Sequence, residues 1–325
     1  MHRAAVLFFY AVSALAAKVD PADIEQWIAS LAGTSIRDAR GHIVGVSLRG
    51  SWVTDTDLDR IAALPDLQKL DLSETHITDL GLERLKNLAN ITELNLYYCE
   101  HVTDGGIAHL RGWKKLERLN VRGTKITDTA LEHISTLTSL VALDAGFAQI
   151  TDNGLDLLSS LTNLKELAIG GNKLTDSGLQ LLRLLPQLRR LDLNGAQRTD
   201  SGLWSATITD GGLDAMLGLK DLEELDLGGT KITDLGLAKL THLTALRSLG
   251  LSRTQITSKG LQNIVELKNL RKLSLWQAKK VDDAVVPTLL SLPQLEFLDV
   301  AETQISAQAL DQLRAKRPDI ALARM

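Results

Sequence analysis

A single pattern of apolar and polar positions recurs along most of the chain. Its copies begin at Ile43, Leu67, Ile91, Leu116, Leu140, Leu164, Leu188, Leu222, Leu246, Leu270 and Leu295. Most copies are 24 residues long, whereas those beginning at Ile91 and Leu270 have 25 residues and the one beginning at Leu188 has 34. A repeat of this length is typical of solenoids, in which each copy supplies one supersecondary unit.

Within a copy, the apolar spacing lengthens from two residues to between three and four. In the copy that begins at Leu67, alternation over residues 70–72 predicts a short strand with one buried face. Leucines at three-residue intervals over residues 82–88 predict a helix, with Thr78 as its N-cap and Asp79 favoured by the helix dipole. A single copy is too small to fold alone, so the copies are expected to stack, with one parallel sheet and an outer layer of helices.

The two ends of such a stack must be covered by segments that differ from the repeat. Asp20 and Pro21 predict a helix start, and the apolar residues within 24–31 share one helical face. After this helix we expect a hairpin that adds an edge strand before the first repeat. The expected organisation is a leader at residues 1–17, an N-terminal cap at 18–42, the solenoid at 43–319 and a tail at 320–325 that starts with the stub of a last strand.

Residues 1–17 have the order of a cleavable secretory signal. Arg3 precedes an apolar run over residues 4–12, and small residues over 13–17 offer a cleavage point. The run is shorter than the ~20 residues that span a bilayer, and no later stretch reaches that length. We therefore expect an exported chain, periplasmic or extracellular, with no transmembrane anchor. The alternative is a buried or frayed N-terminal helix in a cytosolic protein.

The consensus of the copies, Leu-x-x-Leu-x-Leu-x-x-Thr/Cys-x-Ile-Thr-Asp-x-Gly-Leu, resembles the leucine-rich repeat over residues 43–319. Its cysteine-containing subtype is most similar to residues 94–104, which include Cys99. The cysteine is replaced elsewhere by Thr75, Thr124, Thr230, Thr254 and Thr303. Together with the leader, the chain looks like exported bacterial leucine-rich-repeat proteins. The resemblance implies an α/β horseshoe of about eleven 24-residue repeats, with a concave parallel β-sheet and convex α-helices.

Composition narrows the classes of function. Hydrophobic residues make up 44% of the chain, 64 residues are leucine and 23% are charged, which argues against disorder. The formal net charge is -4, and lysine and arginine are scattered, so nucleic acid is not an expected partner. A single cysteine excludes an internal disulfide and a thiolate zinc module.

The sequence holds no motif of a known catalytic, metal-binding or phosphate-binding kind. His109, His133 and His242 lie between apolar positions of helical segments and are expected on the convex surface. Cys99 is expected to be an inert buried thiol, because it lies where the strand turns into the interior. We therefore expect no enzyme, no metal site and no cofactor.

Aspartates recur at one strand position and raise an enzymatic alternative. This position holds Asp71, Asp144, Asp192, Asp226 and Asp299. Asp192 and Asp226 are expected on adjacent strands ~4.8 Å apart, where a glycosidase pair or a calcium site is geometrically conceivable. Solvated or cross-strand-paired carboxylates are the favoured interpretation, because the same position alternates among Asp, Asn and Ser.

The long copy contains ten extra residues, best placed at 196–205. Residues 199–203 repeat residues 175–179 letter for letter, which indicates a partial duplication tolerated on the surface as a loop. The alternative is a binding protrusion with Trp204 at its tip.

Polar strand positions face the concave side, where the copies differ from one another. Only 4% of the residues are aromatic, yet several lie at strand exits together with arginines, and both residue types are common interface anchors. The first predicted patch is Tyr97, Tyr98, Arg118, Arg122 and Phe147, and the second is Arg253, Lys272, Trp276 and Phe297. The rings could instead cover the strand edges of their own repeats. We expect a non-enzymatic recognition scaffold that binds a protein or peptide; the alternatives are a glycan- or peptidoglycan-binding envelope protein and a structural spacer.

Overall fold

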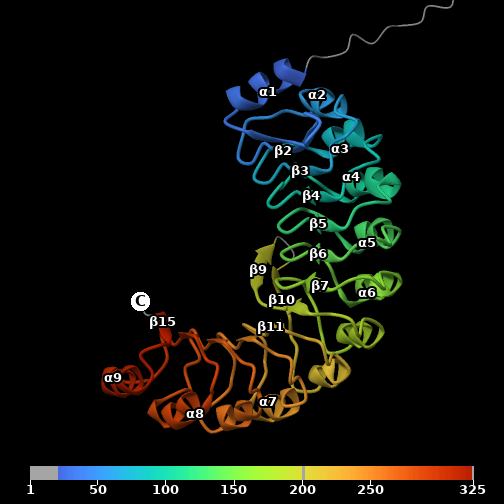
Figure 1. Ribbon diagram of the computed structural model, residues 1–325. Helices are drawn as coiled ribbons and strands as arrows, with labels where there is room; N and C mark the ends of the chain where they lie inside the picture. The colour runs from blue at the N-terminus through green and yellow to red at the C-terminus, as the bar shows by residue number, and fades with distance from the viewer. Residues whose placement is uncertain (1–20, 200–201, 324–325) are drawn as a thin grey trace, which may run out of the picture.

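The computed structural model describes residues 21–199 and 202–323. These residues form a curved solenoid in which strands line the inner side of an arc and helices line its outer side (Figure 1). Helices α1 (Pro21–Ser30) and α9 (Ala307–Lys316) lie at opposite ends of the arc. Within these ranges, no helix is both long enough and apolar enough to cross a membrane. The predicted leader at residues 1–17 lies outside the described residues.

The strands form one 13-stranded sheet. In spatial order they are β1 (Thr34–Arg37), β2 (Ile43–Ser47), β3 (Lys69–Asp71), β4 (Glu93–Asn95), β5 (Arg118–Asn120), β6 (Ala142–Asp144), β7 (Glu166–Ala168), β8 (Arg190–Asp192), β11 (Glu224–Asp226), β12 (Ser248–Gly250), β13 (Lys272–Ser274), β14 (Phe297–Asp299) and β15 (Ala321–Ala323). β1 is antiparallel to β2, and the later pairs are parallel. The register aligns the buried leucines, as in Leu70 beside Leu94, which confirms the predicted α/β solenoid with a concave parallel sheet.

The outer layer is a mixture of α and 3₁₀ helices. Besides α1 and α9, the α-helices are α2 (Leu58–Ala62), α3 (Asp79–Leu85), α4 (Asp104–Ala108), α5 (Asp128–Ile134), α6 (Asp152–Leu155), α7 (Asp234–Leu240) and α8 (Val286–Ser291). The 3₁₀ helices are η1 (His109–Gly112), η2 (Asp156–Ser160), η3 (Gly178–Leu184), η4 (Gly212–Met216), η5 (Gly260–Glu266) and η6 (Asp283–Val285). Segments this short form few i→i+4 hydrogen bonds, so the tighter i→i+3 pattern competes with the α-helix.

A ladder of hydrogen bonds explains the recurring Thr-Asp-x-Gly sequence. Asp79 accepts the backbone N–H of Thr103 at 2.8 Å through Oδ1 and the Thr103 hydroxyl at 2.5 Å through Oδ2. Thr103 in turn caps α4 by accepting the N–H of Gly105. A Cβ at Gly106 would lie 2.5 Å from Asp79 Oδ1, so glycine makes room for the carboxylate. Each helix start is therefore fixed by the preceding repeat.

The same aspartate–threonine contact joins most consecutive repeats. It recurs in Asp55–Thr78, Asp104–Thr127, Asp128–Thr151, Asp152–Thr175, Asp176–Thr209, Asp210–Thr233 and Asp234–Thr257. At the next repeat the roles are exchanged, because Ser258 replaces the aspartate and donates to Asp282 Oδ1 at 2.6 Å. We call this set of contacts the Thr-Asp ladder.

Both ends of the core are covered by non-repeat segments. Ile24 and Ile28 of α1 are buried, and β1 pairs with β2 along one edge of the sheet. At the other end, Arg317 donates to the carbonyl oxygens of Leu292 and Leu295. β15, within the segment 320–325, continues the parallel sheet beside β14.

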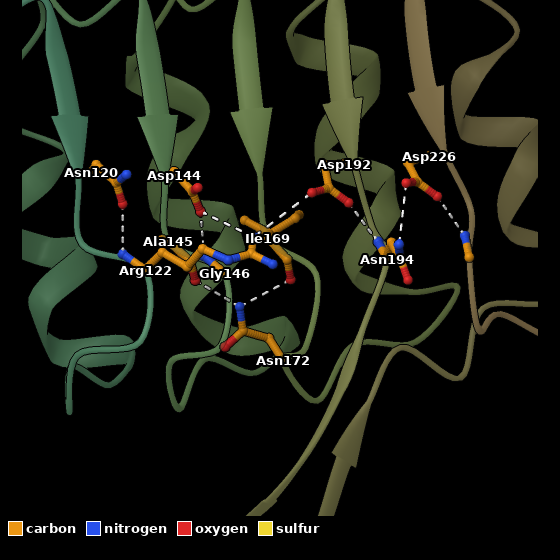
Figure 2. Close-up of polar contacts among 11 residues, drawn as sticks. Asn120, Arg122, Asp144, Ala145, Gly146, Ile169, Asn172, Asp192, Asn194 and Asp226 are labelled. Carbon is orange, nitrogen blue, oxygen red and sulfur yellow. Dashed lines mark hydrogen bonds and ion pairs between the residues drawn. The ribbon is translucent and has the colours of Figure 1, made fainter. Parts of the chain in front are cut away.

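The ten extra residues form a hairpin instead of the expected loop. β9 (Ala196–Thr199) pairs antiparallel with β10 (Gly202–Ser205), outside the main sheet. The hairpin leaves the solenoid at the end of β8 and extends beyond the ends of the parallel strands (Figure 2). Its register places Trp204 opposite Gln197 within the paired strands, so the predicted position of Trp204 at the tip is wrong.

Candidate functional site

The concave face is an open groove of about 840 Å³ that runs across the sheet from β1 to β14. Four rows of side chains are defined by position in the repeat. The leading row is Lys69, Glu93, Arg118, Ala142, Glu166, Arg190, Glu224, Ser248, Lys272 and Phe297. The central row is Asp71, Asn95, Asn120, Asp144, Ala168, Asp192, Asp226, Gly250, Ser274 and Asp299. The trailing row is Ser73, Tyr97, Arg122, Gly146, Gly170, Asn194, Gly228, Ser252, Trp276 and Ala301. The turn row, one residue later, is Glu74, Tyr98, Gly123, Phe147, Gly171, Gly195, Gly229, Arg253, Gln277 and Glu302.

Most cations of the leading row are neutralised by carboxylates of the same row. The ion pairs are Lys69–Glu93 at 2.7 Å, Arg118–Glu166 at 2.9 Å and Arg190–Glu224 at 3.1 Å. Arg118 reaches across β6, where the small Ala142 lies, and donates two hydrogen bonds to Glu166. Arg118, a predicted anchor of the first patch, is therefore already engaged within the protein, and Glu166 is a partner that the sequence reasoning missed.

The central row gathers carboxylates around one guanidinium (Figure 2). Arg122 Nη1 lies 3.7 Å from Asp144 Oδ1 and 3.8 Å from Asp192 Oδ2. A Cβ at Gly146 would lie 2.7 Å from Arg122 Nη1, so glycine there leaves space for the arginine to cross β6. Asp192 and Asp226 lie side by side on β8 and β11, as the repeat alignment predicts. Asn194 Nδ2 donates to Asp226 Oδ2 at 3.2 Å and links the pair.

Burial changes the acidity of this cluster. Burial raises the pKa of Asp192 to about 6. The hydrogen bond from the Asn194 backbone N–H acts in the opposite direction and lowers the pKa, whereas the nearby charge of Asp226 raises it further. Burial likewise raises the pKa of Asp144. The described residues contain no group of three or more His, Cys, Asp or Glu side chains arranged to hold a metal ion. The chemistry present is that of a desolvated, partly neutralised acidic surface.

Residues of the turn row have a left-handed backbone conformation, with positive φ. Tyr98, Phe147 and Arg253 have φ values of +52°, +51° and +56° at the position where Gly123 has +72°. This conformation costs a non-glycine residue about 1 kcal/mol or more, and it recurs at Glu74, Gln277 and Glu302 of the same row, so it belongs to the turn of the repeat. The Phe147 ring lies along the next turns, because a Cβ at Gly195 would come within 2.6 Å of its Cζ.

Aromatic rings and guanidinium groups pair at these exits. Arg122 Cζ lies 4.4 Å from the centre of the Phe147 ring. Arg253 Cζ lies 5.2 Å from the centre of the Trp276 ring. The rings of Tyr97 and Tyr98 pack edge to face with centres 4.6 Å apart. Each ring is held in place before any ligand arrives.

The structure divides the predicted second patch into two pairs of residues. Lys272 and Phe297 are register partners on β13 and β14, and Phe297 is 39% exposed. Arg253 and Trp276 contact each other at the opposite ends of the strands, beyond β12 and β13 and outside the residues that line the groove. Neither Lys272 nor Arg253 has a carboxylate oxygen within 4 Å among the described residues.

The other singled-out side chains lie away from the groove. Cys99 is fully buried, its Sγ–H donates to the carbonyl of Leu72 at 3.0 Å, and burial raises its pKa. On the helical layer, the His133 Nδ1 lies 2.5 Å from an Arg111 nitrogen, and His242 is exposed. His109 is half-buried in the same layer.

One cluster was missed by the sequence reasoning. The rings of Trp52 and His76 pack edge to face at 5.7 Å, and those of His76 and His101 at 5.9 Å. Trp52 is 82% exposed. The signal was present in the chain, because these residues are spaced by 24 and 25 positions, which is the repeat period.

Comparisons with known proteins agree with this architecture. A profile of the family described as Leucine Rich repeat matches residues 63–86, 160–182 and 219–240. Subunit s of the mitochondrial ATP synthase of Mus musculus is 32% identical over 111 residues, which is 32% of this chain. The matched region spans about half, 54%, of the length of that relative.

Solved structures show the same fold at low identity. An internalin of Listeria monocytogenes superposes with a TM-score of 0.56 at 22% identity, over 85% of this chain and 94% of the internalin. A leucine-rich-repeat protein of Leptospira interrogans has a TM-score of 0.52 at 17% identity, over 82% of this chain and 80% of that protein. The stacked strand-and-helix units therefore have the leucine-rich-repeat fold, and three segments of the chain match the profile of that family.

Proposed function

We propose that this chain is a non-enzymatic recognition protein that binds a protein or peptide partner on its concave face. The observation that carries the proposal is the set of pre-ordered rings at the strand exits, just beyond the residues that line the groove: Tyr97 against Tyr98, Phe147 against Arg122, and Trp276 against Arg253. Rings and guanidinium groups supply large contact areas at a low cost in side-chain entropy, and the concave surface is where solenoids present extended binding faces.

The absence of catalysis is part of the proposal. The Asp192 and Asp226 carboxylates are adjacent, but Asn194 and the Gly228 backbone N–H already bond to Asp226, and Arg122 lies against Asp192. These contacts support a role in shaping the surface. A hydrolase screen in which Asp226→Asn abolishes a detected activity would overturn this part of the proposal.

The binding test replaces aromatic side chains whose removal leaves the core intact. The double variant Tyr97→Ala and Trp276→Ala should weaken capture of a partner from the native extract by at least about 2 kcal/mol, the scale of interface anchors. His242→Ala on the helical layer is the control, because His242 is exposed there. Binding is measured by biolayer interferometry after mass spectrometry has named the captured protein. Loss of binding in His242→Ala, with wild-type binding in the double variant, would move the site to the convex face.

Export is proposed from the order of residues 1–17, in which an arginine, an apolar run and small residues follow one another. Mass measurement of the chain recovered from a secreting culture should find a start near Ala17 or Lys18. An intact Met1 in a cytosolic pool would contradict the proposal.

Glycan binding is the second candidate, and the exposed Trp52 favours it. An indole that is 82% exposed beside two imidazole rings offers a flat aromatic surface on which a sugar ring can stack. Sedimentation with peptidoglycan or another insoluble polysaccharide tests this candidate. Trp52→Ala should abolish sedimentation, whereas Tyr97→Ala with Trp276→Ala should leave it unchanged.

A further inference from the structure

The charge balance of the leading row breaks at one end of the sheet. Lys69, Arg118 and Arg190 each have a carboxylate partner in the same row. Lys272 has Ser248 and Phe297 as its register neighbours, and neither can neutralise it. Among the described residues of this row, the Lys272 ammonium group is therefore the cation without a carboxylate partner, and it is available to a ligand.

A second available cation lies in the turn row at the opposite end of the neighbouring strand, five residues after Ser248, the register partner of Lys272. Arg253 is exposed at the end of β12, and no carboxylate oxygen of the described residues lies within 4 Å of it. Its guanidinium packs against the Trp276 ring, which orients the group and leaves its N–H donors free of an ion pair. Lys272 at the start of β13 and Arg253 beyond the end of β12 therefore place one available cation at each end of these strands.

The nearby carboxylates are engaged elsewhere. Asp299 accepts the Ala301 backbone N–H at 3.0 Å and lies 3.4 Å from the Ser274 hydroxyl. Glu302 pairs with Lys279 at 3.1 Å and also accepts hydrogen bonds from Gln277 and from Trp276. Neither neutralises Lys272 or Arg253, so this end of the groove carries uncompensated positive charge.

The middle of the groove has the opposite character. One guanidinium group, that of Arg122, lies among the three carboxylates of Asp144, Asp192 and Asp226. It is within 4 Å of Asp144 and Asp192. A negatively charged segment laid over β6 to β11 would be repelled there, whereas one laid over β12 to β14 would meet Lys272 and Arg253. The groove thus discriminates between positions by charge as well as by shape.

We propose that the β12 to β14 end of the concave face binds an acidic segment of the partner that runs along the strands, with one carboxylate on Lys272 at the strand starts, another on Arg253 at the strand exits, and an aromatic or aliphatic side chain against Phe297. This inference rests on the proposed function and adds the chemistry of the partner and its placement. The exposed part of Phe297 supplies apolar area, and the two cations supply charge-assisted hydrogen bonds at the two ends of the strands.

The test uses three fluorescein-labelled ten-residue peptides and the full mature chain. One peptide combines Asp and Glu with a central Phe, the second has Asn and Gln in place of the acids, and the third has Lys in their place. Fluorescence anisotropy should show the acidic peptide binding at least tenfold more tightly than the other two. Raising the ionic strength should reduce this preference, because exposed charges are screened.

Variants locate the site. Lys272→Ala with Arg253→Ala should weaken binding of the acidic peptide at least tenfold, and Lys272→Glu with Arg253→Glu should transfer the preference to the lysine peptide. Lys69→Ala is the matched control, a lysine of the same row that is paired with Glu93, and it should change binding less than twofold. All replaced side chains are exposed, so thermal midpoints should stay at the wild-type value.

The outcomes separate this inference from the proposed function. Equal binding of the three peptides, no binding of the acidic peptide, or an unchanged affinity in the Lys272 and Arg253 variant would overturn the inference. Capture of the native partner, and its loss in the Tyr97 and Trp276 variant, would still uphold concave binding. If the Tyr97 and Trp276 variant binds the partner like the wild type, the proposed function fails independently of the peptide result.

Discussion

The carboxyl group of Asp192 shows how one residue of the groove responds to its surroundings. Its side chain retains 35% exposure, yet burial raises its pKa from the ordinary 3.8 to about 6. A carboxyl group with a raised pKa binds its proton more tightly in the folded than in the unfolded chain. Its contribution to stability is therefore fully present below pH 3.8 and is lost as the pH rises through 6.

This sign gives a first prediction. Asp192→Asn removes the charge, so the variant should be more stable than the wild type at pH 7.5, by about 1 kcal/mol once solvent screening of a partly exposed group is included. At pH 3.5 the two proteins should have the same stability, because the wild-type carboxyl is then protonated. Guanidinium denaturation midpoints at both pH values measure the difference, and a variant that is less stable at pH 7.5 would contradict the prediction.

The contacts that a side chain makes were harder to predict from the sequence than the position of the residue in its repeat. The repeat alignment places Arg118 and Arg122 at the correct strand positions. It does not reveal that Arg118 pairs with Glu166, 48 residues later, because that contact requires a small residue on the strand between them. The small residues Ala142 and Gly146 leave the space through which the arginine side chains extend. Whether such space exists depends on the residues of three neighbouring strands together.

At the scale of elements, strands were easier to predict than helices. Strand positions follow from alternation, because one face of every strand is buried in the same core. Helix type depends on small differences between i→i+3 and i→i+4 bonding in segments of four to seven residues, and the apolar pattern of α5 and η5 is similar. Likewise, Thr78 and Asp79 were assigned to their own helix start, and the role of Asp79 in capping the next repeat required the structure.

The Thr-Asp ladder supplies the second prediction. Asp79→Ala leaves the Thr103 N–H and hydroxyl without their acceptor and should destabilise the protein by about 1 to 3 kcal/mol. Asp156→Ala is the control, because Asp156 is an exposed residue of η2. Urea denaturation followed by circular dichroism measures both variants. Equal midpoints for the two would show that the ladder adds nothing to stability.

A core leucine of a strand gives the third prediction. Leu94 is 2% exposed and lies between Leu70 and Leu119 in the sheet. Leu94→Ala should lower the free energy of unfolding by about 2 to 5 kcal/mol, since it removes buried methyl groups and leaves a cavity. Tyr97→Ala on the same repeat removes a half-buried side chain that lies outside the core and should cost much less. Thermal denaturation of the two variants side by side provides the comparison.

At the scale of the whole molecule, the two ends of the stack must keep the apolar core and the sheet edges covered. Deleting residues 18–42 would remove Ile24 and Ile28 and strip β1 from β2, which exposes an apolar face and an unpaired strand edge. We predict that the truncated chain aggregates. Size-exclusion chromatography with light scattering measures this. A monomer with the wild-type thermal midpoint would show that these residues do not act as a cap.

The overall architecture was predictable because it follows from periodicity, whereas the insertion was not. A fixed spacing of 24 residues leaves few alternatives to a stack of identical units. The extra residues at 196–205 interrupt the period, and the identity of residues 199–203 with residues 175–179 indicates a duplication but no conformation, so only the structure shows the hairpin.

The Thr-Asp ladder joins each repeat only to its neighbours, and this has a mechanical consequence. Under a pulling force applied at both termini, a chain with nearest-neighbour links should yield in successive steps and not in one event. Each released repeat of 24 residues should lengthen the chain by roughly 80 Å, at about 3.4 Å per extended residue. The repeat with the hairpin should stand out in an optical-trap recording, since its 34 residues give a step of roughly 115 Å.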